Sequence, residues 1–279
     1  MLLRRMIDRL WQTIFWLSGL LLLLLLVSIL SYLIYRGHAA ISLEFLLSSP
    51  KGLPLGAEGG ILPAIKGTLC LVVLAVAVAS VPGLATAVYL VEYGEKNSLS
   101  QIINTTVQCM AGLPSIVTGL FCYALFVVRL GFGISLLAGG LALGMMVFPV
   151  IVVTARDALL AVNNHYRLVG IALGVSRRYL LVRVLLPQAL PGILGGMLLA
   201  MGYAAGATAP IMVTAAAIAT PTAGNLFEPV MALPYHLYIL FSQQVSLDKA
   251  YGTALVLVSL LLVLNVIALW LRQRKGRGV

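Results

Sequence analysis

Few side chains in this chain could carry out acid–base, nucleophilic or metal chemistry, and their spacing does not form a catalytic motif. The sequence has no His-Glu-x-x-His, no aspartate inside an apolar run, and no serine placed within reach of a histidine. It also has no Gly-x-x-x-x-Gly-Lys-[Ser/Thr] phosphate loop. The three cysteines, Cys70, Cys109 and Cys122, lack metal or redox spacing and are predicted to be small buried side chains. These observations argue against an intramembrane enzyme or a metal centre.

Four side chains could instead donate hydrogen bonds or positive charge in an apolar environment. Ser115 and Thr118 are three residues apart and share one face of a helix, and Thr208 shortly precedes Pro210. Because proline has no N–H, the carbonyl four residues earlier in a helix would lose its usual partner. Lys66 lies at the start of an apolar run. The alternatives are that the hydroxyls bond neighbouring helices or their own backbone, and that Lys66 extends to lipid headgroups.

The arginine-rich stretch 166–193 lies between two apolar runs of membrane length. Read as one helix, it gathers apolar residues on one side and two glycines on another, where missing side chains would let a second subunit come close. Two prolines then interrupt the chain. This pattern suits docking to a soluble partner, and a basic loop held at lipid headgroups is the alternative. The apolar side comprises Leu168, Ala172, Val175 and Tyr179, the glycine side Gly170, Gly174 and Arg177, and the prolines are Pro187 and Pro191.

The composition is that of an integral membrane protein. Hydrophobic residues make up 61% of the 279 residues and charged residues 9%, and the mean hydropathy is +1.07. A soluble domain is about a quarter charged. The net charge of +10 does not indicate nucleic-acid binding, because the basic residues cluster at the ends of apolar runs and are not interleaved with aromatics.

Six apolar runs predict an all-α membrane protein with six transmembrane helices. Lys and Arg are concentrated in the segments that lie inside if the N-terminus is inside, so both termini are predicted to be cytoplasmic. Helices are expected because each satisfies its backbone hydrogen bonds within itself. The predicted spans are 11–35, 64–91, 101–128, 134–154, 191–217 and 251–271.

Several polar residues lie near the predicted ends of these spans. His165 and His236 have no partner suggested by the sequence and are predicted to be polar loop residues. Arg156 and Asp157 are expected to pair with each other or to contact headgroups. Glu92 ends the second span, where it would either contact a partner subunit or lie in a solvated turn.

Several stretches together resemble one family, the A-type permease subunit of the bacterial phosphate ABC importer, a type I ABC importer permease. The docking loop of that family resembles the arginine-rich stretch, with Gly174 and Leu186-Pro187 matching its pattern. The resemblance covers about residues 59–270. The other similar stretches are GGILPAIKGTL (59–69), VYLVEYGEKN (88–97), LPSIVTGLF (113–121) and GATAP (206–210).

The resemblance implies a subunit of an ATP-driven importer for inorganic phosphate in the bacterial inner membrane. It would form half of the translocation path, bind no nucleic acid and no cofactor itself, and use ATP and Mg through a separate ATPase. Its implied partners are a second homologous permease, an ATP-binding subunit dimer, an extracytoplasmic solute-binding protein and the lipid membrane. The implied division of the chain is a first helix with its cytoplasmic end (1–36), an extracytoplasmic segment (37–63), a permease core (64–271) with a coupling helix at about 155–187, and a basic tail (272–279).

The same resemblance assigns roles to individual residues. Since an oxyanion in a low-dielectric path needs donors to replace its hydration, the hydroxyls and the lysine become candidates for the substrate path. The candidate path residues are Ser115, Thr118, Thr208 and Lys66. The candidate ATPase-docking residues are Arg167, Leu168, Gly170, Gly174, Arg177 and Pro187.

The chain departs from the family pattern at three charged positions. Ala207 stands where the family has a glutamate, Tyr203 where it often has an arginine, and Leu168 where the docking loop has a glutamate. Either the second permease supplies the missing polar groups, or the chain is a divergent relative. The alternatives are therefore an importer permease for sulfate, molybdate or tungstate, and a non-conducting scaffold subunit.

Overall fold

A computed structural model describes residues 2–54, 56–94, 97–217 and 224–276, which are mostly helical. The long helices are α1 (Leu2–Gly37), α3 (Leu62–Val88), α6 (Leu136–Leu160), α9 (Leu186–Gly206) and α12 (Leu247–Gly276). The shorter α-helices are α2 (Leu43–Leu47), α4 (Ser98–Gly112), α5 (Ser115–Cys122), α7 (His165–Ala172), α8 (Arg177–Leu180), α10 (Ala209–Thr214) and α11 (Leu233–Ser242). The remaining elements are one 3-10 helix, three π-helices and two antiparallel strands. They are η1 (His38–Ala40), η2 (Tyr89–Tyr93), η3 (Tyr123–Arg129), η4 (Leu181–Leu185), β1 (Pro50–Lys51) and β2 (Glu58–Gly59).

The predicted membrane helices are confirmed in number and approximate place. Five described helical segments are long and apolar enough to cross a membrane, and a sixth is counted if one bent helix pair forms a single span. The five are Met6–Ala40, Leu62–Tyr93, Leu136–Leu160, Arg177–Gly206 and Leu247–Ile267, and the bent pair is Ser98–Gly112 with Ser115–Arg129.

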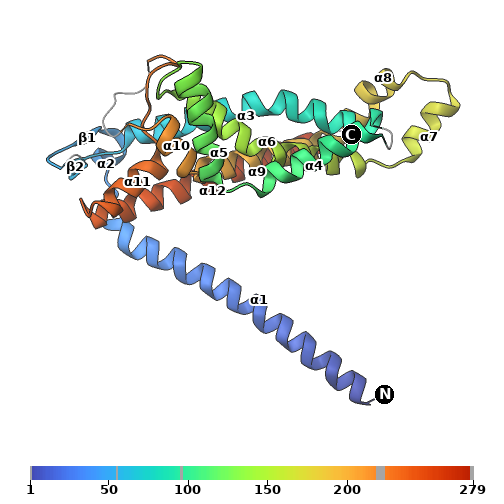
Figure 1. Cartoon of the computed structure of the whole chain (residues 1–279). Coiled ribbons are helices and arrows are strands. Elements are labelled where there is room, and N and C mark those ends of the chain that lie inside the picture. The colour runs from blue at the N-terminus through green and yellow to red at the C-terminus, as the bar shows by residue number, and fades with distance from the viewer. Residues whose placement is uncertain (1, 55, 95–96, 218–223, 277–279) are drawn as a thin grey trace.

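The core of the bundle is formed by α3, α6 and α9, which lie side by side along its length (Figure 1). Small residues allow these helices to approach closely. A Cβ atom on Gly140 of α6 would overlap the Leu74 Cδ2 atom of α3, and a Cβ on Gly192 of α9 would lie 2.7 Å from the Ala158 Cβ atom of α6. Leu71 and Leu143 are fully buried between the helices. Packing of this kind, rather than water exclusion, stabilises helices against one another in lipid.

The third predicted span is not a continuous helix. α4 and α5 meet at an angle of 105°, and Leu113 between them has an extended backbone with φ −72° and ψ 135°. The cause is Pro114, which has no N–H and sterically disfavours helical geometry in the residue before it. A hydropathy pattern does not register this break, because the residues on both sides of it are apolar.

The fifth predicted span is displaced toward the N-terminus at both ends. The continuous helical segment begins at Arg177, and η4 leads into α9, so Pro187 and Pro191 both lie within helical structure. The helix then ends at Gly206, and Ala207 is extended with φ −76° and ψ 123°. Treating both prolines as interruptions was wrong, because a membrane helix tolerates proline where neighbouring helices and local π-helical turns, such as η4 before Pro187, satisfy the freed backbone groups.

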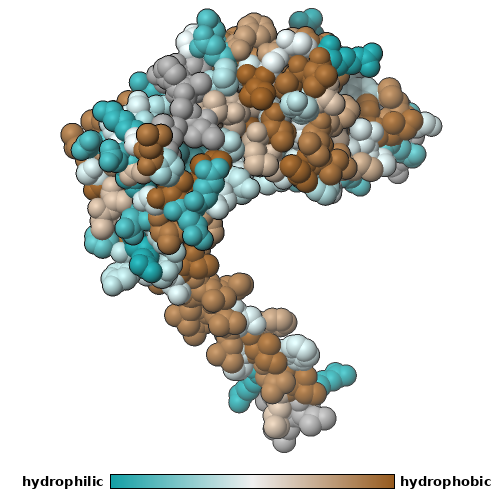
Figure 2. Space-filling view, turned by 60° about the vertical axis from the view of Figure 1, so that its left-hand side comes forward, coloured by the Kyte–Doolittle hydropathy of each residue, from teal (hydrophilic) through white to brown (hydrophobic). Residues whose placement is uncertain are grey.

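The helix α1 leaves the bundle as a separate arm (Figure 1). Near its C-terminal end it packs against α12 and η1, where the rings of Tyr32 and Tyr251 meet edge to face. The rest is an almost uninterrupted hydrophobic surface (Figure 2), and Leu20 to Leu26 are each more than half exposed. Such a surface is stable only when it is covered by lipid or by another protein.

We predict that Gly67→Ala destabilises the fold, because the added methyl group would overlap the Met231 carbonyl oxygen. Overpacking of this kind costs about 1–3 kcal/mol. Thermal unfolding of the detergent-solubilised protein should show a lowered midpoint. Gly202→Ala is the control, since no atom lies within 4 Å of the position that its Cβ would take. Equal midpoints for the two variants would contradict the prediction.

Candidate functional site

The arginine-rich segment folds into two short helices at one end of the bundle (Figure 1). The single predicted helix is wrong, because α7 ends at Ala172 and Gly174 takes a left-handed backbone with φ +69°. Such a φ favours glycine, so the role of Gly174 is to turn the chain between α7 and α8. The predicted coupling helix at about 155–187 is correspondingly shorter, because residues up to Leu160 still belong to α6.

The side chains around this turn divide into a buried and an exposed set. Gly170 is buried under Leu180 of α8, and a Cβ on it would lie 3.0 Å from the Leu180 Cδ2 atom. The space left by the missing side chain of Gly170 is therefore filled by Leu180 of the same chain, whereas the sequence suggested that a second subunit would come close there. Ile171, Leu173 and Leu168 are 74%, 72% and 58% exposed. An exposed apolar surface of this kind is typical of a contact with another protein or with a membrane.

Of the other predicted docking residues, Arg167 turns inward, towards the bundle. Its guanidinium forms an ion pair with the Glu92 carboxylate, with an N–O distance of 2.7 Å, and donates to the carbonyl oxygens of Leu159 and Val162. The two side chains are only 19% and 14% exposed. Glu92 thus contacts α7 of its own chain. Arg177 and Pro187 are exposed, on α8 and on the first turn of α9.

Three of the four predicted path residues lie where two helices are broken. Ser115 and Thr118 are both on α5, directly after the α4–α5 break, and Thr208 lies in the α9–α10 break. The two breaks belong to packed elements, because a Cβ on Gly119 of α5 would lie 2.8 Å from the Cα atom of Pro210 in α10. Pro210 starts α10, so it does not interrupt a helix as the sequence suggested.

Thr118 lines a small cavity of about 150 Å³ beside the α4–α5 break. The rest of its wall is apolar, and the Thr118 hydroxyl supplies a hydrogen-bonding group in it. Lys66 is exposed on the first turns of α3. The other cavity-lining residues are Met110, Leu113, Val117, Phe121 and Met145.

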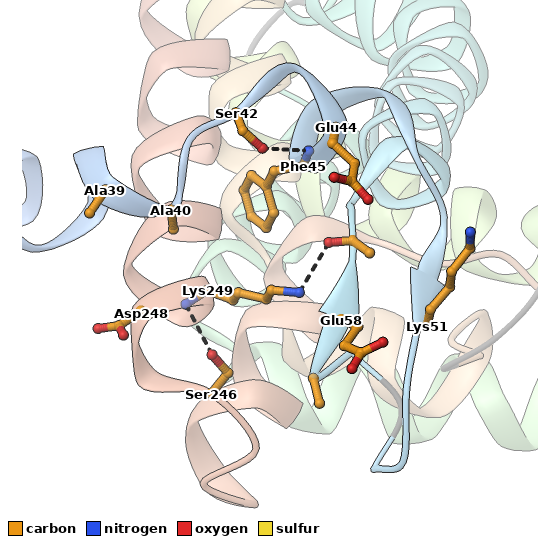
Figure 3. Close-up of a pocket in the computed structure, with 12 residues that line it drawn as sticks. Ala39, Ala40, Ser42, Glu44, Phe45, Lys51, Glu58, Ser246, Asp248 and Lys249 are labelled. Carbon is orange, nitrogen blue, oxygen red and sulfur yellow. Dashed lines mark hydrogen bonds between the residues drawn. The ribbon is translucent and has the colours of Figure 1, made fainter.

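The opposite end of the bundle carries the β1–β2 hairpin and a larger, charged pocket of about 700 Å³ (Figure 3). The Lys249 side chain extends across the pocket, and its ammonium group donates a hydrogen bond to the carbonyl oxygen of Gly59 at 3.1 Å. Glu44, Glu58 and Asp248 also line the pocket, and none of the three forms a salt bridge with a described residue. Lys51 lines the pocket as well, so this end presents three carboxylates and two lysines.

Several single-residue expectations need correction. His236 is not a polar loop residue: it is 5% exposed within α11, and burial lowers its pKa to about 4. His165 begins α7. Cys70 and Cys109 are exposed and only Cys122 is buried, because the first two lie on outward faces of their helices. Among the described residues, no group of three or more His, Cys, Asp or Glu side chains is placed to hold a metal ion.

The sequence profile of the family described as "Binding-protein-dependent transport system inner membrane component" matches residues 79–278. The chain belongs to this family. It is 30% identical to the "Probable ABC transporter permease protein YqgI" of Bacillus subtilis, over 96% of each chain. It is 34% identical to the "Phosphate transport system permease protein PstA 1" of Mycobacterium tuberculosis strain H37Rv, over 96% of this chain and 88% of that one.

Solved structures of importers in this class have the same fold. The inward-facing MetNI methionine ABC transporter matches with a TM-score of 0.65 over 77% of this chain and 95% of that one, at 17% identity. An amino acid ABC transporter matches with a TM-score of 0.56 over 76% of this chain and 94% of that one, at 19% identity. The protein is therefore a multi-pass inner-membrane permease of the ABC importer class, with the type I importer fold, and it is a transport subunit rather than an enzyme.

We predict that Arg167→Gln loosens α7 from the bundle. The change leaves the half-buried Glu92 carboxylate without its ion pair and weakens the bonds to two carbonyl oxygens. Hydrogen bonds to charged groups contribute about 1.5–3 kcal/mol, so amide exchange in 163–173 should accelerate by about tenfold or more. Hydrogen–deuterium exchange with mass spectrometry measures this rate.

Arg183→Gln is the matched control, because it removes an exposed arginine from η4. Glu92→Gln should produce the same acceleration, and combining it with Arg167→Gln should add little. Strictly additive effects would mean that the two side chains do not act as a pair.

Proposed function

We propose that this chain is the permease subunit of an ATP-driven importer for inorganic phosphate. The observation that carries the proposal is the 34% identity to a phosphate transport system permease, which extends over 96% of this chain. The described site is compatible with this cargo, because hydroxyl groups line the helix breaks and can donate hydrogen bonds to an oxyanion.

The α7–α8 turn would dock to the ATP-binding subunit on the cytoplasmic side. Its exposed apolar side chains would fill a groove on that subunit, while the Arg167–Glu92 ion pair would hold α7 to η2 at the end of α3. A movement of the ATPase pair would then be transmitted to the bundle through a half-buried ionic contact. Transmission of movement through this contact is what an alternating-access mechanism needs, with α7 acting as a rigid lever.

The hairpin end would face the extracytoplasmic solute-binding protein. Its pocket carries three carboxylates and two lysines, so charged side chains on that partner would pair with it and orient the encounter. A second permease would cover part of the exposed apolar surface and complete the path. Gly202 and Gly206, which meet no atom within 4 Å, leave room on α9 for a closely packed helix.

Another tetrahedral oxyanion, such as sulfate, molybdate or tungstate, is the second candidate cargo. The observation in its favour is that Ala207 and Tyr203 replace the family's charged residues at the α9–α10 break and near it. Tyr203 is 54% exposed and could face the second permease. A non-conducting subunit would also tolerate these changes, so transport must be measured directly.

We predict ATP-dependent uptake of radiolabelled phosphate by proteoliposomes that contain this chain with its partner subunits, ATP inside and the solute-binding protein outside. Ile171→Asp should reduce uptake by at least tenfold, because a carboxylate would be buried in an apolar contact. The ATPase should also fail to co-purify with this variant. Leu53→Asp, at a fully exposed position near the hairpin, is the control for retention of the ATPase.

The outcomes separate the candidate functions. Uptake of sulfate, molybdate or tungstate without phosphate would replace the cargo and keep the permease. No uptake of any anion by an assembled complex would indicate a scaffold subunit. Uptake that Ile171→Asp leaves unchanged would exclude the α7–α8 surface as the docking site.

We predict that Thr118→Val reduces phosphate uptake about tenfold, since the variant keeps the side-chain shape and removes a hydroxyl from the cavity at the helix break. Loss of one hydrogen bond to a charged partner corresponds to about 1.5–3 kcal/mol. Initial uptake rates at several phosphate concentrations provide the measurement. Thr106→Val is the control, because the exposed Thr106 hydroxyl donates to the carbonyl oxygen of Ile102 in its own helix. Equal rates for the two variants would remove Thr118 from the path.

A further inference from the structure

A second polar cavity, of about 370 Å³, lies where η2, α4 and α6 meet. It is close to the α7–α8 end, because Leu90 and Val91 in its wall directly precede Glu92, the partner of Arg167. Its polar lining consists of Asn97, Ser100, Gln101, Asn104 and Arg156. The docking surface and the helix breaks do not involve these residues.

The acceptor atoms of two asparagines in this cavity are already used within the chain. Asn104 Oδ1 accepts from Arg156 Nη1 at 2.8 Å, and Asn97 Oδ1 accepts from the backbone N–H of Ser100 at 2.8 Å. Each Oδ1 keeps a second lone pair, and each asparagine also carries an NH₂ group that can only donate and that has no acceptor among the described residues. Arg156 was expected to pair with Asp157 or to contact headgroups; in the structure it donates to Asn104 and forms no salt bridge with Asp157.

Further donors complete this arrangement. The Arg156 guanidinium has more N–H groups than its single bond to Asn104 uses. The N-terminus of the 15-residue helix α4 lies at the same place and adds a partial positive charge. No described carboxylate lines the cavity. An excess of donors around one arginine is the chemistry that binds a tetrahedral oxyanion.

We propose that this cavity is a binding site for a phosphate group, held by Arg156 and by the amide groups of Asn97 and Asn104. Two sources offer the same chemistry: a free phosphate ion, and the headgroup of an anionic phospholipid. The site is separate from the cavity at Thr118, and its existence does not depend on which anion the importer carries.

The test uses the full-length chain in its transporter complex and two probes. The first probe is inorganic phosphate, whose binding is measured by equilibrium dialysis in a neutral detergent. The second is phosphatidylglycerol, whose retention is measured by native mass spectrometry after release from nanodiscs of phosphatidylcholine with phosphatidylglycerol. Arg156→Gln should weaken binding of one of the probes at least tenfold, whereas Arg183→Gln, which removes an exposed arginine, should leave both unchanged.

Asn104→Asp is a second variant that keeps the acceptor for Arg156, replaces the donor group with a carboxylate, and has nearly the same shape. It should lower binding of the same probe even if Arg156→Gln assembles poorly. Loss of phosphate binding identifies the free ion, and loss of phosphatidylglycerol identifies the headgroup. If both variants assemble and bind both probes like the wild type, the site does not exist. Uptake is not a readout, so a failed phosphate assignment for the importer leaves this test intact.

Discussion

In the hydrocarbon core of a bilayer no water can bond to an unpaired backbone N–H or C=O group, and the whole structure depends on this constraint. This constraint requires the apolar runs to be helices. At every helix break it also requires a hydrogen-bond partner from elsewhere for the backbone groups that the helix no longer pairs. The breaks in this protein occur after α4 and after α9. The two breaks are packed against each other through α5 and α10, and hydroxyl side chains lie at both. A permease can use such places to replace part of the hydration shell of its cargo.

Charged side chains lie at the root of α7, whereas the helix breaks carry uncharged ones. The one salt bridge seen among the described residues, between Arg167 and Glu92, holds the docking helix to the bundle. The helix breaks, in contrast, have no charge where the family has a glutamate, because Ala207 occupies that position. A half-buried ion pair resists bending because separating it would leave each charge unpaired in a poorly solvated place. In the proposed mechanism this contact would make the lever rigid at its root, and selectivity would depend on neutral donors and on a second permease.

Several exposed apolar surfaces of this chain are not covered by any other described part of it. The arm α1, the tip around Ile171 and the empty side of α9 at Gly202 all lack cover within the chain. Lipid can cover α1, and the tip around Ile171, which extends beyond the bundle, is the surface proposed to meet the ATP-binding subunit. This agrees with a family whose members operate as parts of binding-protein-dependent transport systems.

The sequence by itself determined the membrane class, the approximate place of the spans and the family, because hydropathy and local motifs depend only on residues close together in the chain. It also placed Ser115 and Thr118 on one helix face, since the helical repeat fixes that relation. Only the tertiary structure decided that Arg167 faces Glu92, 75 residues away, and that Leu180 fills the notch at Gly170. The burial of His236 was likewise decided by tertiary packing. Each depends on which distant helix packs alongside, and a pattern of neighbouring residues contains no information about that.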